Sequence, residues 1–356
     1  MIAKVKLVFF GIINVIMLIF ALLIYNVKAT AQSYIHTPIS TSSCILTGNL
    51  YGNSVYLADL NKNIYQFDSL SDFNLANYQL ESDSISSLVV IDKIYATHSS
   101  KNYVSCIDQG LETLITVGSG PCACIFDGYK YIWTADRLGN SISSIDITSS
   151  TLNETYPIGW EPNDIAYDGA GNVIVCLKSD KKIAVFNIEN EMVASLISVG
   201  NSTNYPKKIF CDSNTTVWVM GSTDIVQKID LQQNTVTNTF NITPQLTRTG
   251  VFYSPQGGDL PCVSSIGTKA TPIGVSTNLS TLFIGDDSSN PAIHFFNKKD
   301  GSYILSVCLN EYNSLSSFYV DNFYIYTYSL NGDTKKFSMF NSLTRKNIIV
   351  EFEITS

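Results

Sequence analysis

One short pattern recurs after residue 43 and constrains the fold more than any other feature of the chain. Each copy has an apolar residue, an aromatic residue, two small or apolar residues and a final residue that is usually polar. The copies are Val55–Asp59, Ile94–His98, Ile132–Asp136, Val173–Leu177, Val217–Gly221, Leu282–Asp286 and Ile325–Ser329. The second position is aromatic in every copy except the fourth, where it is Ile174. Such self-similarity indicates a chain built from repeats of one supersecondary unit.

A second pattern follows each copy after about ten residues, with two apolar positions and a final Asp or Asn. It ends at Asp68, Asp108, Asp146, Asn187, Asp230, Asn297 and Asn341. Most copies lie about 40 residues apart, which is the length of a four-stranded propeller blade. We therefore expect residues 44–356 to form one all-β domain, a seven-bladed β-propeller of about 28 short strands with almost no helix.

One unit shows the strand pattern throughout. Its apolar-alternating runs predict strands over Pro162 to Tyr167, Asn172 to Leu177, Lys182 to Asn187 and Met192 to Val199. Counted the same way, the first inner strand starts at Cys44, and the last outer strand covers Asn347 to Ile354. We expect the aromatic position to pack between neighbouring blades rather than to stack on a ligand.

The units resemble the YVTN-type β-propeller repeats of surface-layer and other extracytoplasmic proteins, which are related to NHL and lyase-type propellers. The resemblance covers roughly residues 44–354 and rests on Val117–Pro121, Asp146 and Val199–Gly200, at the Val-Gly…Pro and Ile-Asp positions of that repeat. The fourth signature residue of the family, Asn, is Asp, His, Leu, Gly or Ser here. The resemblance implies the fold, but packing and turn residues say little about function.

The N-terminus carries a targeting signal. Lys4 and Lys6 precede an apolar run, Leu7 to Tyr25, which would rise roughly 28 Å as a helix, and Ala29–Ala31 resembles a cleavage site. Residues 1–31 are therefore either a cleaved signal peptide or a retained membrane anchor, and residues 32–43 form a polar linker. In both cases we expect the propeller outside the cytoplasm, secreted or membrane-anchored through residues 7–25.

One interval between copies is longer than the others. The sixth copy follows the fifth with about 25 extra residues, which lie at about 243–270. In the family resemblance this connection joins an outer strand to the next inner strand, on the face where propellers usually bind. The insertion is either a functional loop or a tolerated surface excursion.

Composition excludes several classes of function. The net charge of −8 offers no basic surface for phosphate backbones, so we expect no nucleic-acid partner. The chain has three histidines, and no Ser or Cys has an evident partner base, so a hydrolytic triad has no support.

Acidic and polar residues supply the candidate binding site. Carboxylates at Asp59, Asp136, Asp224, Asp286 and Asp287 are expected in second-to-third-strand turns, and the segment Trp160 to Asp164 enters the same face. The ligand-face candidates are Trp160, Glu161, Asn163, Asp164, Asp136, Asp286 and Asp287. Glu161, Asn163 and Asp164 are candidate ligands of Ca²⁺ or Mg²⁺, because hard cations prefer oxygen ligands. The alternative is that these Asp and Asn residues only shape turns.

Cysteines and sequons add two expectations. We expect at most two disulfides, with Cys262 the first candidate, because four other cysteines occupy strand positions as small apolar residues: Cys106, Cys124, Cys176 and Cys211. The glycosylation acceptors are Asn153, Asn201, Asn214, Asn241 and Asn278, a number that chance alone would produce.

Two functions remain open from the sequence. The first is a non-enzymatic secreted or cell-surface glycoprotein that binds a protein or a glycan through the loop-bearing face of the propeller. The second is a metal-dependent enzyme of lyase or lactonase type, using Glu161 and Asp164 at the mouth of an acidic channel. Scarce histidine and the missing acid–base pair favour the binding module.

Overall fold

The structure is a computed structural model that describes residues 45–51, 54–59, 62–68, 76–81, 83–223, 225–241, 272–277, 280–286, 292–308, 314–320, 324–331, 334–341 and 352–354. Its regular elements are 28 β-strands, which confirms the all-β expectation. No helix in this described part is long and apolar enough to span a membrane. The apolar run 7–25, the linker 32–43 and the insertion 243–270 lie outside the described residues.

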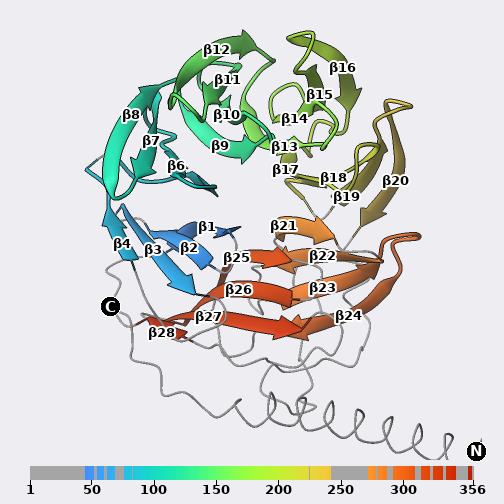
Figure 1. Cartoon of the computed structure of the whole chain (residues 1–356). Helices are drawn as coiled ribbons and strands as arrows, with labels where there is room; N and C mark the ends of the chain where they lie inside the picture. The colour runs from blue at the N-terminus through green and yellow to red at the C-terminus, as the bar shows by residue number, and fades with distance from the viewer. Residues whose placement is uncertain are drawn as a thin grey trace, which may run out of the picture. The chain divides into compact units, whose positions relative to one another are not determined.

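The strands form seven four-stranded antiparallel sheets, each made of four consecutive strands in chain order (Figure 1). The first two sheets contain β1 (Ile45–Tyr51), β2 (Ser54–Asp59), β3 (Asn63–Asp68) and β4 (Ala76–Gln79), then β5 (Ser87–Val90), β6 (Ile94–Thr97), β7 (Tyr103–Asp108) and β8 (Leu111–Thr116). The third and fourth contain β9 (Pro121–Phe126), β10 (Tyr131–Asp136), β11 (Ser141–Asp146) and β12 (Thr151–Pro157), then β13 (Pro162–Tyr167), β14 (Asn172–Leu177), β15 (Lys182–Asn187) and β16 (Met192–Ser198).

The remaining three sheets repeat this order. The fifth contains β17 (Pro206–Cys211), β18 (Thr216–Gly221), β19 (Ile225–Asp230) and β20 (Thr235–Asn241). The sixth contains β21 (Pro272–Thr277), β22 (Thr281–Asp286), β23 (Ala292–Asn297) and β24 (Tyr303–Cys308). The seventh contains β25 (Ser314–Val320), β26 (Tyr324–Asn331), β27 (Thr334–Asn341) and β28 (Phe352–Ile354).

The strands predicted for the fourth sheet are confirmed almost residue for residue. Its first three strands have the expected bounds, and β16 ends at Ser198, one residue before the predicted Val199. The final outer strand starts at Phe352 in the structure, whereas the sequence predicts Asn347; residues 342–351 lie outside the described part. Local alternation of apolar residues is therefore a sufficient signal for these strands.

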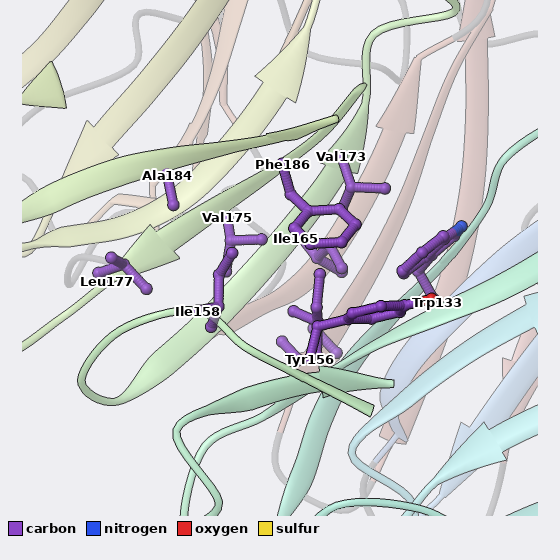
Figure 2. Packing of buried hydrophobic residues seen from close by; sticks show 12 residues of the cluster. Trp133, Tyr156, Ile158, Ile165, Val173, Val175, Leu177, Ala184 and Phe186 are labelled. Carbon is purple, nitrogen blue, oxygen red and sulfur yellow. The ribbon is translucent and has the colours of Figure 1, made fainter. Parts of the chain in front are cut away.

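The aromatic position of the repeat lies in the core, as expected. Its described side chains are at most 8% exposed in every copy that can be assessed: Tyr56, Tyr95, Trp133, Trp218 and Phe283. Trp133 shows why, since its ring lies 5.6 Å from that of Phe186 in the next sheet and 5.9 Å from that of Tyr156 (Figure 2). One cluster thus joins the third and fourth sheets, and the aromatic side chain fills the space between them.

The Asp or Asn that ends the second pattern caps a tight turn between the third and fourth strands. Asp230 Oδ1 accepts the backbone N–H groups of Gln232 at 2.8 Å and Gln233 at 2.9 Å. The corresponding oxygens of three other sheets accept in the same way, at Asp146, Asn187 and Asn297. A side-chain oxygen that bonds the backbone two or three residues later stabilises a turn, which explains this position of the repeat.

Replacing the cap in the fifth sheet tests this explanation. We expect Asp230→Ala to lower the free energy of unfolding by about 1 kcal/mol, because two turn N–H groups lose their protein acceptor. Asp230→Asn should retain most of the stability, since Asn187 and Asn297 make the same bond in other sheets. Chemical denaturation of both variants measures the difference, and equal stabilities for the Ala and Asn variants would contradict the capping role.

Candidate functional site

Four connecting segments of the third to fifth sheets hydrogen-bond to one another and form one surface, here called the connection face. It consists of residues 137–140, 158–161, 178–181 and 199–205. The N–H of Ile158 donates to the carbonyl of Asn140 at 3.1 Å, and the N–H of Lys178 donates to that of Glu161 at 3.0 Å. These bonds hold the loops of adjacent sheets in fixed relative positions.

Trp160 is the most exposed aromatic residue of the connection face. Its side chain is 64% exposed, while its backbone N–H donates to Asp180 Oδ2 at 2.8 Å. Gly159 precedes it with φ 140°, and a Cβ there would lie 2.5 Å from Leu177 Cδ1, so only glycine fits. The loop is fixed through its backbone, and the indole remains available to a partner.

Glu161 lies beside Trp160 and is held by neighbouring polar groups. Its carboxylate accepts a hydrogen bond from Ser179 and pairs with Lys178, with 3.5 Å between Oε1 and Nζ. The Ser179 hydrogen bond, followed by the charge of Lys178, lowers the pKa of Glu161. Lys178 Nζ also lies 5.4 Å from the ring centroid of Tyr205, so this lysine contacts both the segment of Glu161 and the segment of Tyr205.

Asn163 and Asp164 lie within β13 and bind the next sheet rather than the surface. Asn163 Nδ2 donates to the carbonyl of Pro206 at 3.1 Å. Asp164 is 9% exposed; its Oδ2 accepts the N–H of Ile209 at 2.8 Å, and its Oδ1 lies 3.3 Å from Lys208 Nζ. The charge of Asp164 raises the pKa of Lys208. Both side chains therefore join β13 to β17.

The structure does not support the expected metal site at Glu161, Asn163 and Asp164. The described residues contain no group of three or more His, Cys, Asp or Glu that could hold a metal ion. Glu161 and Asp164 each pair with a lysine of this chain, and the Asn163 amide nitrogen is committed to a backbone carbonyl. Both carboxylates thus have lysine partners within the chain, and a Ca²⁺ or Mg²⁺ site at these three residues stays a prediction.

The sequence predicts Asp136 in a turn between second and third strands on the ligand face, but the structure places it within a strand and buries it. It is the last residue of β10 and is 0% exposed. Its carboxylate accepts three hydroxyl groups, from Thr134 at 2.7 Å, Ser141 at 3.2 Å and Ser143 at 2.6 Å. Burial raises the pKa of Asp136 to about 6, although the three hydroxyls oppose this. The Asp136 carboxylate is therefore buried within the protein and cannot touch a ligand on the connection face.

The other acidic candidates cannot be placed at the site. Asp59 and Asp286 end β2 and β22, respectively, and their side chains are outside the described part of the structure. Asp224 and Asp287 lie outside the described residues altogether. Among the acidic candidates, therefore, those whose side chains the structure describes all have partners within the protein.

Two residues of the connection face were not predicted. Leu138 is 62% exposed and lies over Gly120, where a Cβ would be 2.7 Å from Leu138 Cγ. Arg137 precedes it, and its charge contributes to lowering the pKa of Glu161. Both follow directly after the polar position of the third copy of the repeat. The repeat pattern ends at Asp136 and does not include these two residues; their position directly after the pattern is the sequence signal that marks them.

A buried Ser–His contact was also missed by the sequence reasoning. The Ser105 hydroxyl lies 2.8 Å from His98 Nε2 and donates to Glu112 Oε1 at 2.6 Å. Ser105 and His98 are both 0% exposed, and burial lowers the pKa of His98. Since no substrate reaches a hydroxyl at this depth, the contact joins strands of the second sheet and is not a nucleophile–base pair.

The five cysteines whose side chains the structure describes are free thiols. They are Cys106, Cys122, Cys124, Cys176 and Cys211, and Cys106, Cys124 and Cys176 are buried. Burial raises the pKa of Cys124 to about 12, so this thiol is unreactive. Cys262, the first candidate for a disulfide, lies outside the described residues.

Four of the five sequon asparagines are described, and all four are exposed: Asn153, Asn201, Asn214 and Asn241. Asn153 is the third residue of β12, and its Nδ2 donates to Ser144 Oγ at 3.1 Å. Asn278 lies outside the described residues. Glycosylation of Asn153 would replace one of the two N–H groups on the nitrogen that makes this hydrogen bond.

Comparison with known proteins places the fold but no family. No family model and no curated protein matches the chain. The chain is similar in structure to the computationally designed Ika8 protein, known from a crystal structure, with a TM-score of 0.63 and 12% sequence identity. The match covers 91% of this chain and 92% of the designed one. At this identity the likeness concerns the fold alone.

Proposed function

We propose that the seven sheets close into a seven-bladed β-propeller of the YVTN-repeat type, exported by residues 1–31. The first strands of successive sheets contact one another from β1 to β25, and β25 in turn contacts β1, which supports a closed ring. In a closed ring the first strands line the central channel, and the connections 158–161 and 199–205 each lead into a first strand, so the connection face would lie beside the mouth of that channel. The repeat patterns support membership of this propeller class.

The function we propose is non-enzymatic binding of a protein or glycan at the connection face. The observation that carries it is Trp160, whose exposed indole sits on a loop fixed by Asp180 and Gly159. Trp, Tyr and Arg dominate the binding energy of protein interfaces, and Trp160, Tyr205 and Arg137 are all in or beside the same hydrogen-bonded loops. A rigid aromatic loses little entropy on binding, which favours it as an anchor.

The enzymatic alternative lacks a comparable observation. A lyase or lactonase of this class would need Glu161 and Asp164 free for a metal ion, whereas both are paired with lysines. On the connection face Glu161 instead pairs with Lys178, and Asp180 accepts the N–H of Trp160. These partners support a docking surface over a metal-assisted reaction.

Photo-crosslinking at two exposed aromatic positions tests the proposed face. A photoreactive phenylalanine analogue replaces either Trp160 or Tyr129, which is 86% exposed in the β9–β10 turn at the opposite end of the strands. We expect a discrete crosslinked species on the surface of the producing cells from position 160 and none from position 129. Excess unlabelled wild-type protein should compete it away, and excess Trp160→Ala protein should not.

Two results would contradict the proposal. Equal crosslinking from positions 129 and 160 would show that the connection face has no preference for a partner. Competition by Trp160→Ala as strong as that by the wild type would show that the indole contributes nothing to binding. Digestion of the species with glycosidases or proteases then separates a glycan partner from a protein partner.

A further inference from the structure

The outer edge of the fourth sheet is a surface that the connection face does not use. β16 lies at the end of the strand order β13-β14-β15-β16 and hydrogen-bonds to β15 (Figure 1). The strand Met192–Ser198 contains no charged residue, and Met192 and Leu196 are 59% and 52% exposed. Natural proteins usually protect such edges with charges, because an open strand edge pairs with other chains.

The other outer strands whose side chains are fully described differ from this one. β4 is uncharged as well, but it has only four residues, and its exposed ones, Asn77 and Gln79, are polar. β8 contains Glu112, β12 contains Glu154 and the sequon at Asn153, and β20 ends at the sequon asparagine Asn241. A charge or a glycan at these positions would hinder pairing at the edge. Among β4, β8, β12, β16 and β20, therefore, β16 is the strand that combines the absence of charge with exposed large apolar side chains.

Opposite charges flank the two ends of β16. Glu189 and Glu191 are exposed in the turn before its first residue. At its other end, Lys182 pairs in register with Ser198, and the carbonyl of Lys181 accepts the N–H of Val199 at 3.1 Å. Lys181, Lys182 and Glu189 make no ion pair within the described part of the chain. One end of the strand is thus acidic and the other basic.

We propose that β16 is a homodimer interface that pairs antiparallel with β16 of a second copy of this chain. A two-fold axis through the middle of the strand places the acidic end of each copy against the basic end of the other. The same rotation brings Leu196 and Met192 of both copies towards one apolar strip. A second copy fits this edge because the charge pattern is complementary to itself, which no arbitrary partner would share.

Two features limit the strength of this dimer. Val185 pairs with Ser195 and Phe186 with Val193, so Ala194 forms a bulge close to the two-fold axis, and this bulge interrupts the new ladder. Two copies that each carry a net charge of −8 also repel one another. We therefore expect a weak interface, with a dissociation constant of about 10–100 µM.

Charge reversal with complementation tests the pairing on the full chain. Sedimentation velocity across a concentration series should show a monomer–dimer equilibrium for the wild type. The first double variant, Lys181→Glu with Lys182→Glu, makes both ends of the strand acidic. The second, Glu189→Lys with Glu191→Lys, makes both ends basic. Each variant alone should dimerise at least about tenfold more weakly than the wild type. Mixing the two variants restores the complementarity and should restore the dimer.

A matched apolar pair provides the control. Leu196→Ser should weaken the dimer, and Leu114→Ser on β8, whose leucine is 55% exposed, should not. The proposal is overturned if the wild type stays monomeric at several times 100 µM, or if Leu114→Ser and Leu196→Ser act alike. It is also overturned if the mixed charge variants fail to associate while each retains the wild-type melting temperature. Because Glu191 accepts the Tyr156 hydroxyl at 2.9 Å, the melting temperature checks the folding of that variant.

Discussion

Trp133→Ala is expected to lower the free energy of unfolding by about 3–5 kcal/mol, the range for removing a large buried aromatic side chain. The indole is 2% exposed and lies between the third and fourth sheets, next to Tyr156 and Phe186. Its Nε1–H also donates to Asp127 Oδ2 at 3.4 Å. The substitution removes an apolar contact between two sheets and leaves a carboxylate oxygen without its donor, so two costs add.

Chemical denaturation measures this effect, and Trp160→Ala is the matched control. The Trp160 side chain is 64% exposed, so its removal should change stability by less than about 0.5 kcal/mol. Trp133→Phe should recover part of the loss, because an aromatic ring still fills the space between the sheets. If Trp133→Ala proved as mild as Trp160→Ala, the aromatic position of the repeat would not be the contact that joins neighbouring sheets.

The buried carboxyl of Asp136 is expected to make the fold more stable in mild acid than at neutral pH. Burial raises its folded-state pKa to about 6, whereas an exposed Asp titrates near 3.8. Below about pH 4 both states are protonated, and the stabilising effect of the neutral carboxyl is fully present. As the pH rises through 6, the folded protein must ionise a buried group, and the free energy of unfolding falls by about 3 kcal/mol.

Asp136→Asn isolates this contribution. The amide stays neutral at all pH values and retains an oxygen that accepts the hydroxyls of Thr134, Ser141 or Ser143. The stability of the wild type relative to the variant should therefore decline between pH 4 and pH 7 and stay constant above it. The difference between the two proteins removes the opposite effect of His98, whose pKa is lowered by burial and whose protonation destabilises the fold in acid.

Unfolding followed from pH 4 to pH 8 for both proteins provides the measurement. Parallel curves would show that Asp136 has an ordinary pKa and that the hydroxyls around it compensate fully for burial. Asp146→Asn serves as the control for the substitution itself, because that carboxylate also caps a surface turn, and the backbone hydrogen bond from Ser149 lowers its pKa, so it should leave the pH profile in this range unchanged.

The strand pattern of this protein was predictable from its sequence because it depends on neighbours in the chain. Short apolar runs bounded by turn residues define β13, β14 and β15 to the residue, and an Asp or Asn at the end of a third strand defines the next turn. The aromatic position was also predictable as core, since a ring flanked by apolar residues in a repeated strand must be buried between repeats. Each of these signals acts within about ten residues.

The roles of the polar candidates were decided by tertiary structure. Asp164 meets Lys208, 44 residues later, and Asn163 meets Pro206, 43 residues later, because β17 packs beside β13. Asp136 turns into its own sheet, where the hydroxyls of Ser141 and Ser143 surround it, although its place at the end of the repeat pattern suggested a turn between the second and third strands. A sequence pattern specifies where a carboxylate stands along a strand. The packing of strands within and between the sheets decides whether that carboxylate faces solvent, a lysine or three hydroxyls.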